Sequence, residues 1–407
     1  MKVIRNLALL TLVCALAAAP AAALDYTYTG HDTNVHTENV FVNVNDYLPW
    51  RSGGSARAMG MAGAYTAIGD DLAAIEYNPA GLANVKHLQV SMLGVMSRNT
   101  ELGATSDFEK KQKWETDPSF AAAAFKLWRI TAGVAMRRPH FDNVYQSFGA
   151  IQNNVRAPDG YVMQYDRFSD RIDVNNLKTY TVSAALDMGH LAVGANFNAI
   201  DGTVFRYVRG RVSSREGTGF NSQFNSEDRA DFSGYTGDLG ALAKFGFLKL
   251  GFSAKNMLGN VKVTQDYLWR DDFAVGAGNF WVYDPGATEK TYNRFAPTYT
   301  GGVGLDFGKL LLLDVDYEWV NIKDREAALV RAGVETRIIP FLPIRAGFQS
   351  DVKNSTNFNN KEATSVFLGT GLKIWVVSVD GSLTLAQLRY GREGKNVTGA
   401  VSAGIGF

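Results

Sequence analysis

Side chains of opposite character alternate along residues 311–319, and this pattern constrains the fold more than any other stretch of the chain. In an extended strand, one face would carry five apolar side chains: Leu311, Leu313, Val315, Tyr317 and Trp319. The other face would carry a leucine and three acids: Leu312, Asp314, Asp316 and Glu318. Three unpaired carboxylates do not fit the dry core of a soluble β-sandwich. They fit a strand that faces lipid on one side and an enclosed, watery lumen on the other.

The same alternation continues in the two segments that follow, and it adds basic residues to the polar face. Four charged side chains lie there between apolar ones: Arg331, Glu335, Arg337 and Arg345. The predicted lumen therefore holds charges of both signs at similar depth. Such charges could pair across the lumen, which would lower the cost of crowding them.

From residue 85 the sequence divides into fourteen segments that read as strands. The connections between them are alternately long and short. The predicted long loops are 97–118, 139–174, 202–233, 258–295, 321–327, 351–363 and 388–397. Long outer loops and short periplasmic turns are typical of bacterial outer-membrane barrels. We therefore predict an all-β fold, in which residues 85–407 form a 14-stranded antiparallel transmembrane β-barrel.

The N-terminus reads as an export signal over residues 1–23. It has the basic residues Lys2 and Arg5, an apolar stretch and a small-residue cleavage site. The single cysteine, Cys14, lies inside this signal, so the expected mature chain has none. That excludes disulfides, thiolate metal sites and cysteine catalysis. Residues 24–54 form a polar extension to which the sequence assigns no structure.

Residues 55–84 form the one later segment that reads as short helices, and small side chains mark it. Ala56, Gly60, Gly63 and others recur at three- and four-residue spacing, which favours close backbone approach. A second short helix is predicted to follow Asp70 and Asp71, and to end before Asn78-Pro79. Helices this short are not stable alone, so the segment must be held by the barrel.

This segment resembles a known family signature. The run that carries the resemblance is Gly60, Gly63, Ala67, Asp70, Asp71, Asn78, Pro79 and Ala80. It is similar to the N-terminal hatch of the FadL-type outer-membrane transporters of hydrophobic compounds, and to a run in PorV-like porins of a secretion machinery. The resemblance implies a 14-stranded barrel with a helical hatch in its lumen. It also implies capture on outer loops, passage to a pocket above the hatch, and lateral exit through a kink in the third strand.

Two sets of candidate site residues follow from this resemblance. The hatch and gate residues are Gly60, Gly63, Asp70, Asp71, Asn78, Pro79 and Ala80, although a purely structural plug would use the same residues. Ligand capture is expected on the third and fourth outer loops, 202–233 and 258–295. Aromatic residues gather in the latter: Phe273, Phe280, Trp281 and Tyr283. These aromatics could instead fold the loop onto the barrel rim.

The expected function is passive uptake of a hydrophobic ligand, a fatty acid or hydrocarbon, across the outer membrane of a diderm bacterium. The alternative is a PorV-like barrel that acts as a scaffold or shuttle in a secretion or surface assembly. A general diffusion porin fits less well because of the hatch. The terminal Phe407 resembles the signal read by the barrel assembly machinery.

Other chemistry finds no support in the sequence. The histidines show no metal-ligand spacing, and no complete nucleotide-binding or nucleophile motif is present, so we expect neither an enzyme nor a cofactor. The sequence has no basic patch of the kind that binds nucleic acid, so we expect no nucleic-acid partner. We expect a monomer whose surroundings are outer-membrane lipid.

Overall fold

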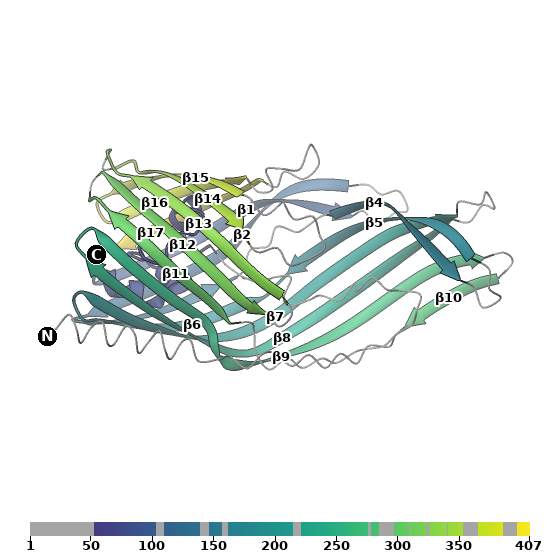
Figure 1. Cartoon of the computed structure of the whole chain (residues 1–407), viewed down its shortest axis with the longest axis horizontal. Helices are drawn as coiled ribbons and strands as arrows, with labels where there is room; N and C mark the ends of the chain where they lie inside the picture. The colour runs from purple at the N-terminus through teal and green to yellow at the C-terminus, as the bar shows by residue number, and fades with distance from the viewer. Residues whose placement is uncertain are drawn as a thin grey trace.

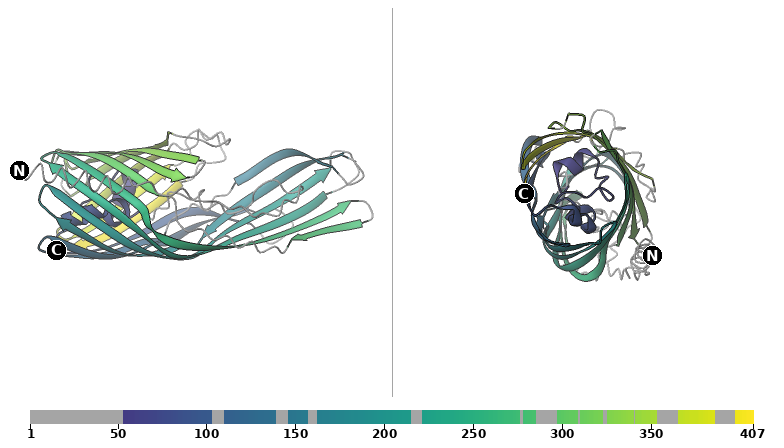
Figure 2. Two further views of the ribbon diagram at one scale, coloured as in Figure 1. Left: turned by 60° about the horizontal axis from the view of Figure 1, so that its bottom comes forward. Right: turned by 90° about the vertical axis from the view of Figure 1, so that its left-hand side faces the viewer.

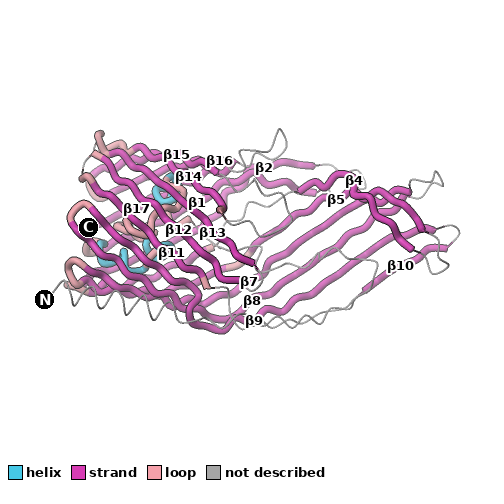
Figure 3. Tube along the Cα trace, in the orientation of Figure 1, coloured by secondary structure: helices cyan, strands magenta, loops and turns pink. Residues whose placement is uncertain are grey.

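The structure is a computed structural model, and it describes residues 53–102, 110–138, 146–156, 162–214, 221–275, 278–284, 297–308, 310–322, 325–339, 341–352, 365–385 and 397–407. Three short helical elements come first: α2 (Ala56–Gly60), α3 (Ala74–Tyr77) and the 3-10 helix η2 (Pro79–Asn84). Within these ranges no helix has the length and apolar character needed to cross a bilayer. The remaining elements are strands (Figures 1 and 3).

The strand bounds are β1 Leu88–Leu102, β2 Lys110–Leu127, β3 Ile130–Arg137, β4 Gln146–Arg156, β5 Val162–Asn175, β6 Lys178–Asp187, β7 Leu191–Ser214, β8 Asn221–Phe245, β9 Leu248–Val275, β10 Gly278–Asp284, β11 Thr298–Asp306, β12 Leu311–Ile322, β13 Arg325–Thr336, β14 Ile344–Asp351, β15 Ser365–Ile374, β16 Val377–Leu385 and β17 Val397–Gly406.

Fourteen of these strands close into a ring, as the sequence predicted. The order is β1–β2–β3–β6–β7–β8–β9–β11–β12–β13–β14–β15–β16–β17, and β17 pairs with β1 to complete it. Every one of these pairings is antiparallel. Viewed end on, the strands surround the short helices (Figure 2). Because the ring is closed, every ring strand has a neighbour on each side to pair with its backbone N–H and C=O groups. Such pairing is needed in the hydrocarbon core of a bilayer, where no water is present to bond these groups.

The outer face of the ring is apolar and the inner face is not. Along β12, Val315 is about half exposed while its neighbours Asp314 and Asp316 are fully buried. The same outward row continues on other strands, where Met92 and Val182 are each 60% exposed. Because an exposed apolar belt of this extent would be unfavourable in water, the ring has the surface of a barrel that sits in lipid.

Part of what the sequence predicted as outer loops is sheet, because β4, β5 and β10 lie outside the ring and pair with long ring strands. The ring strands β7, β8 and β9 have 24, 25 and 28 residues, whereas about 9–11 residues cross a bilayer. Their outer parts continue as a sheet: β5 pairs with β7, β4 with β5, and β10 with β9 (Figure 1). Much of the predicted loops 139–174, 202–233 and 258–295 is therefore strand. Alternation did not reveal it, because a strand outside the membrane needs no unbroken apolar row.

The predicted loop 321–327 is also largely strand. β12 continues to Ile322, which pairs with Arg325 of β13, so only a two-residue connection remains between them.

Three glycines form a crease where the extended sheet leaves the ring. Gly202, Gly234 and Gly259 lie on the adjacent strands β7, β8 and β9, with φ of +138°, +154° and +140°. A Cβ at each would lie 2.4, 2.2 and 2.1 Å from a carbonyl oxygen of the chain alongside. Only glycine adopts this backbone without strain. The crease therefore depends on all three residues.

Candidate functional site: the stoppered lumen

The helical segment from Ser55 to Asn84, here called the hatch, folds through side-chain caps. Ser55 caps α2, since its Oγ accepts a hydrogen bond from the Ala58 N–H at 3.1 Å. Asn78 ends α3 and caps η2, where its Oδ1 accepts from the Ala80 N–H at 3.1 Å and Pro79 takes the first helical position. The predicted second helix is shorter than expected and begins at Ala74.

The two hatch aspartates differ in their relation to that helix. Asp71 accepts a hydrogen bond from the Ala73 N–H at 2.9 Å, just before α3 begins. Asp70 instead faces Arg57 of α2. Asp71 therefore supplies the predicted acceptor near the helix start, and Asp70 does not.

Wall glycines make room for the hatch. Three directly paired sets face it, one residue from each of six strands: Gly194 with Gly240, Gly251 with Gly302, and Gly333 with Gly347. A Cβ at Gly194 would lie 2.4 Å from the Pro79 carbonyl carbon, and one at Gly347 would lie 2.4 Å from the Ala62 nitrogen. Real Cβ atoms do not approach other atoms so closely. The hatch backbone therefore lies directly on the wall backbone.

We call the wall surface on which the hatch backbone lies, formed by these paired glycines, the seat. The predicted hatch residue Gly60 also contacts the wall closely. A Cβ at Gly60 would lie 3.0 Å from the Gly369 Cα, and a Cβ at Gly369 would lie 3.1 Å from the Gly60 Cα. Gly63 has φ of +70°, and its space is bounded by the Tyr77 ring. Both glycines are thus required by the fold of the hatch, and their role as a gate stays a prediction.

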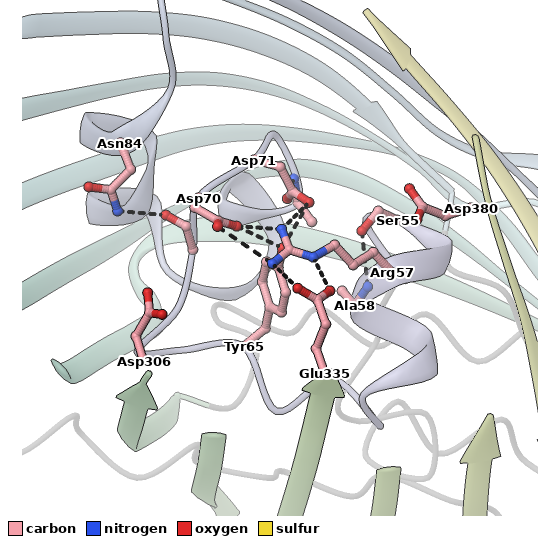
Figure 4. Close-up of polar contacts among 12 residues, drawn as sticks. Ser55, Arg57, Ala58, Tyr65, Asp70, Asp71, Asn84, Asp306, Glu335 and Asp380 are labelled. Atoms are coloured by element: carbon pink, nitrogen blue, oxygen red, sulfur yellow. Dashed lines mark hydrogen bonds and ion pairs between the residues drawn. The ribbon is translucent and has the colours of Figure 1, made fainter. Parts of the chain in front are cut away.

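Arg57 of α2 joins the hatch to the wall (Figure 4). Its Nη1 lies 2.5 Å from Asp70 Oδ1 and 3.5 Å from Asp71 Oδ2, both in the hatch. Its Nε donates to Glu335 Oε2 of β13 at 2.7 Å. Tyr65 completes the group by donating its hydroxyl to Asp71 Oδ2 at 2.8 Å.

Glu335 extends this group along the wall. Arg345 donates to it at 2.6 Å and Arg337 at 2.5 Å. Arg345 also donates to Asp380 of β16 at 2.7 Å. The predicted luminal charges Glu335, Arg337 and Arg345 are thus brought together, and we name this set, with Arg57, Asp70, Asp71 and Asp380, the ionic latch.

The two latch aspartates respond differently to their surroundings. Burial raises the pKa of Asp71, and the neighbouring charge of Asp70 raises it further. The charge of Arg57 lowers this pKa, but by less, so the pKa of Asp71 lies above its ordinary value. Burial opposes ionisation of Asp70 as well, but the Arg57 charge and hydrogen bond hold the pKa of Asp70 below its ordinary value. Arg57 therefore stabilises the ionised form of Asp70 much more than that of Asp71.

The acidic row of β12 faces the lumen, as predicted, and two of its members bind the hatch. Asp316 Oδ2 accepts three hydrogen bonds from the hatch: the backbone N–H groups of Tyr65 at 2.9 Å and Thr66 at 3.1 Å, and the Thr66 hydroxyl at 2.8 Å. Asp314 accepts from the Ala67 N–H at 3.3 Å. These carboxylates hold a hatch turn that has a single helical backbone hydrogen bond of its own, from the Gly69 N–H to the Tyr65 carbonyl at 3.3 Å.

The last acid of the row, Glu318, pairs within the wall. It accepts a hydrogen bond from Arg331 of β13 at 2.8 Å, and Thr300 of β11 also donates to it, at 3.2 Å. Glu318 and Arg331 are almost fully buried. All seven predicted luminal charges therefore face inward and contact either the hatch or one another.

A second polar layer, absent from the predicted site, lies toward the outer end. Arg137 of β3 is 3.4 Å from Glu76 of α3 and donates to Asn198 at 2.6 Å. Asn196 donates to the Ile75 carbonyl at 2.9 Å, and both asparagines donate to Asp238. The sequence signal available was the alternation of Asn196 and Asn198 with apolar residues on β7.

The opposite side of the hatch is apolar. Ile75 and Leu72 pack in one cluster with wall residues that face the lumen: Leu93 and Val95 of β1, Phe120, Ala122 and Ala124 of β2, and Ala135 of β3. The lumen thus has a charged side, at β12 to β16, and an apolar side, at β1, β2 and Ala135 of β3. The hatch is ion-paired to the first and packed against the second.

The predicted capture aromatics lie beyond the ring. Phe273 belongs to β9, while Phe280, Trp281 and Tyr283 belong to β10, and the backbones of Phe273 and Phe280 are paired. They therefore belong to a strand pair instead of the predicted loop. Their side chains are outside what the structure describes, so the capture role stays a prediction.

Metal chemistry finds no site in the described part of the chain, where no three His, Cys, Asp or Glu side chains are grouped so as to hold an ion.

The chain has no match among known proteins by sequence, but it has matches by structure. No protein-family profile matches the chain, and no curated protein matches it in sequence. Solved structures do match. TbuX, a toluene transporter of Ralstonia pickettii, is 15% identical, with 87% of this chain and 98% of that one covered at a TM-score of 0.54.

Two further structures give the same result. CymD, described as a monoaromatic hydrocarbon channel, is 15% identical over 87% of this chain and 97% of its own, with a TM-score of 0.56. The toluene transporter TodX of Pseudomonas putida is 13% identical over 87% and 98%, again with a TM-score of 0.56. At these identities the likeness shows the fold, and that fold is the one the sequence predicted, a 14-stranded antiparallel β-barrel with short helices near its N-terminus.

Proposed function

We propose that this chain is an outer-membrane channel for passive uptake of small, uncharged hydrophobic compounds. The observation that carries the proposal is the two-sided lumen. A seated hatch closes the ring as its ionic latch joins one wall, while the other wall presents buried apolar side chains. An apolar solute would partition to that second side because leaving water is favourable there. The three structural relatives described as toluene or monoaromatic hydrocarbon channels support this proposal.

The charge pairing favours a neutral ligand over a fatty acid. Each luminal arginine named above already contacts a carboxylate of the protein: Arg57, Arg137, Arg331, Arg337 and Arg345. A ligand carboxylate would have to displace one of these partners and leave it buried without a countercharge. A hydrocarbon has no such cost. Fatty acids therefore stand second to neutral hydrocarbons as the proposed ligands.

The wall offers a sideways exit near β3. β3 has eight residues and pairs with β2 only from Phe120 to Leu127, although β2 begins at Lys110. In the described ranges, residues 110–118 of β2 thus pair on one side alone. The β1–β2 register also shifts here, opposite Pro118, which has no N–H to donate. β3 itself pairs in unbroken register, so we place the exit at its outer end instead of at a kink within it.

Uptake into liposomes tests the proposal. Vesicles with the purified barrel should accumulate labelled toluene faster than empty vesicles, and should take up a long-chain fatty acid no faster. Leu93→Glu should slow toluene uptake about tenfold, since a buried charge on the apolar side costs several kcal/mol. Gln89→Glu, four residues away on the same face of β1, is the matched control and should leave the rate unchanged. Equal rates for Leu93→Glu and wild type would refute the route.

One observation supports the alternative function, a scaffold or shuttle in a secretion or surface assembly. The sheet of β4, β5, β7, β8, β9 and β10 projects beyond the ring, and within the residues that the structure describes β4 and β10 are its two edges. Edge strands can pair with strands of other chains. Recovery of the barrel with a secreted partner, together with no toluene uptake, would favour this second function.

A further inference from the structure

The part of the sheet that projects beyond the ring, here called the outer sheet, has two free margins. It consists of β4, β5, β10 and residues 204–214, 221–233 and 260–275 of β7, β8 and β9. Within the residues that the structure describes, β4 pairs only with β5 and β10 only with β9, so these two strands form its margins (Figure 1). The margins present backbone N–H and C=O groups to which a further strand could bind.

The β10 margin lacks the features that usually keep edge strands from pairing. Charged residues and proline are the common protection, and neither occurs among the five residues from Asn279 to Tyr283. Three of those five are aromatic, which favours strand pairing. β4 also has no charge or proline before Arg156, but a bulge interrupts it between Phe148 and Ile151. β10 is therefore the less protected margin.

The two margins run in opposite directions. β10 returns toward the ring, because it is antiparallel to β9, which leaves the ring. β4 runs outward, because it is antiparallel to β5, and β5 is antiparallel to the outward-running β7. Barrels in one membrane share an orientation, so β10 of one copy would meet β4 of another in an antiparallel pair, like the other pairings of the sheet. Two like margins could meet only in parallel.

The margins also lie at the same level of the outer sheet. Followed across the paired strands, Gln146 of β4 and Asp284 of β10 both lead to Val208 of β7. Two residues further out, Phe148 and Val282 share a second such line. A neighbouring copy could therefore continue the hydrogen-bond ladder of this sheet.

Charge divides the outer sheet into unlike halves. β4, β5 and residues 204–214 hold six arginines and three aspartates, whereas residues 221–233, residues 260–275 and β10 hold seven acidic and three basic residues. A contact between β4 and β10 would join a basic half to an acidic half, while two like margins would repel each other.

We propose that neighbouring barrels associate through the outer sheet, with β10 of one copy paired antiparallel with β4 of a second copy of this chain. Direction, level and charge all favour this pairing over one between like margins. Because the contact joins unlike margins, it can continue from copy to copy and form rows or closed rings. It departs from the monomer that the sequence led us to expect, and it stands whether or not the barrel transports hydrocarbons.

Cysteine pairs test the contact, because the expected mature chain has no cysteine. Cells that express Phe148→Cys and Val282→Cys together should give covalent dimers when a short thiol cross-linker is added to their outer membranes. Cells that express either variant alone should give none, and they control for crowding because they hold the same thiols at the same height. Dimers from a single variant, no dimers from the mixture, or a cross-link to a different protein would each overturn the proposal.

A charge placed on the β10 margin gives a second test. Asn279→Lys, added to the Val282→Cys variant, would set a cation against the basic half of the neighbouring copy, so the cross-link should be lost. Asn279→Ser at the same position is the matched control and should keep the cross-link. Heat-modifiable mobility on electrophoresis shows that both variants are folded. An undiminished cross-link with Asn279→Lys would contradict the pairing.

Discussion

At the scale of single residues, Arg57 joins the hatch to the wall. Its contact with Glu335 joins positions 278 residues apart in the chain. The sequence predicted charges of both signs on the wall, but it did not indicate that a hatch arginine would share them. Alternation assigns a face to a residue; it does not identify a partner on a distant element. The predicted pairing across the lumen is therefore partly a pairing between wall and plug.

Glu335→Gln should weaken the barrel more than other charge removals. The glutamine would take one carboxylate partner from each of the buried Arg57 and Arg345. Because each arginine keeps another carboxylate, we expect a cost at the lower end of about 3–5 kcal/mol. Urea unfolding of the refolded protein measures this change. Asp306→Asn is the control, since its pair with Lys249 is 2.8 Å long but more exposed, and it should cost no more than about 1 kcal/mol. Equal losses in the two variants would show that the latch is not special.

The aspartates of the latch should respond oppositely to pH. The folded pKa of Asp71 is raised, so its ionised form destabilises the fold above that pKa, and Asp71→Asn should stabilise the protein at neutral pH. The folded pKa of Asp70 is lowered, so its stabilising effect is present at neutral pH and is lost as pH falls through the folded pKa; Asp70→Asn should destabilise. Melting temperatures at neutral and acid pH measure both. The same sign for both variants would contradict this assignment.

At the scale of elements, the seat of the hatch is a set of backbone contacts. Gly301 and Gly302 are neighbours on β11 with opposite surroundings. A Cβ at Gly302 would meet Asp316 at 2.3 Å and Thr66 at 2.9 Å, whereas nothing lies within 4 Å at Gly301. Gly302→Ala should therefore displace the hatch and expose its backbone to protease, and Gly301→Ala should not. Protease digestion of the folded barrel distinguishes the two, and equal protection would argue against the seat.

The crease glycines can be tested in the same way, by comparing alanine at a crease glycine with alanine at a nearby glycine outside the crease. Gly234→Ala would place a methyl group against the Asn260 carbonyl at a φ that alanine avoids, while a Cβ at Gly237, three residues on, would meet only ordinary contacts at 3.5 Å or more. Gly234→Ala should lower the yield of folded barrel, and Gly237→Ala should not. Heat-modifiable mobility on electrophoresis reports the folded fraction.

Some elements could be predicted from the sequence and others could not, for one physical reason. Membrane-crossing strands carry an apolar row that lipid requires, so all fourteen ring strands were found. β4, β5 and β10 pair outside the ring without such a row, and they were missed. The hatch was found through its small residues and Asn78-Pro79, but its shorter second helix and its wall partners depend on tertiary contacts.

At the scale of the whole molecule, the central claim is that the hatch stays seated while an apolar solute leaves sideways through the wall, at the outer end of β3. The Ala56 N–H donates to Ser402 Oγ of β17 at 3.1 Å, so these residues mark a contact between plug and wall. The predicted mature chain lacks cysteine, so Ala56→Cys/Ser402→Cys gives a pair that a short thiol cross-linker can join without side reactions.

Toluene uptake by liposomes containing this double variant, measured before and after cross-linking, tests the claim most directly. The account predicts the same rate in both states, because the hatch need not move. A rate that falls to that of empty vesicles on cross-linking, and returns when a cleavable linker is cut, would show that the hatch opens and would contradict it.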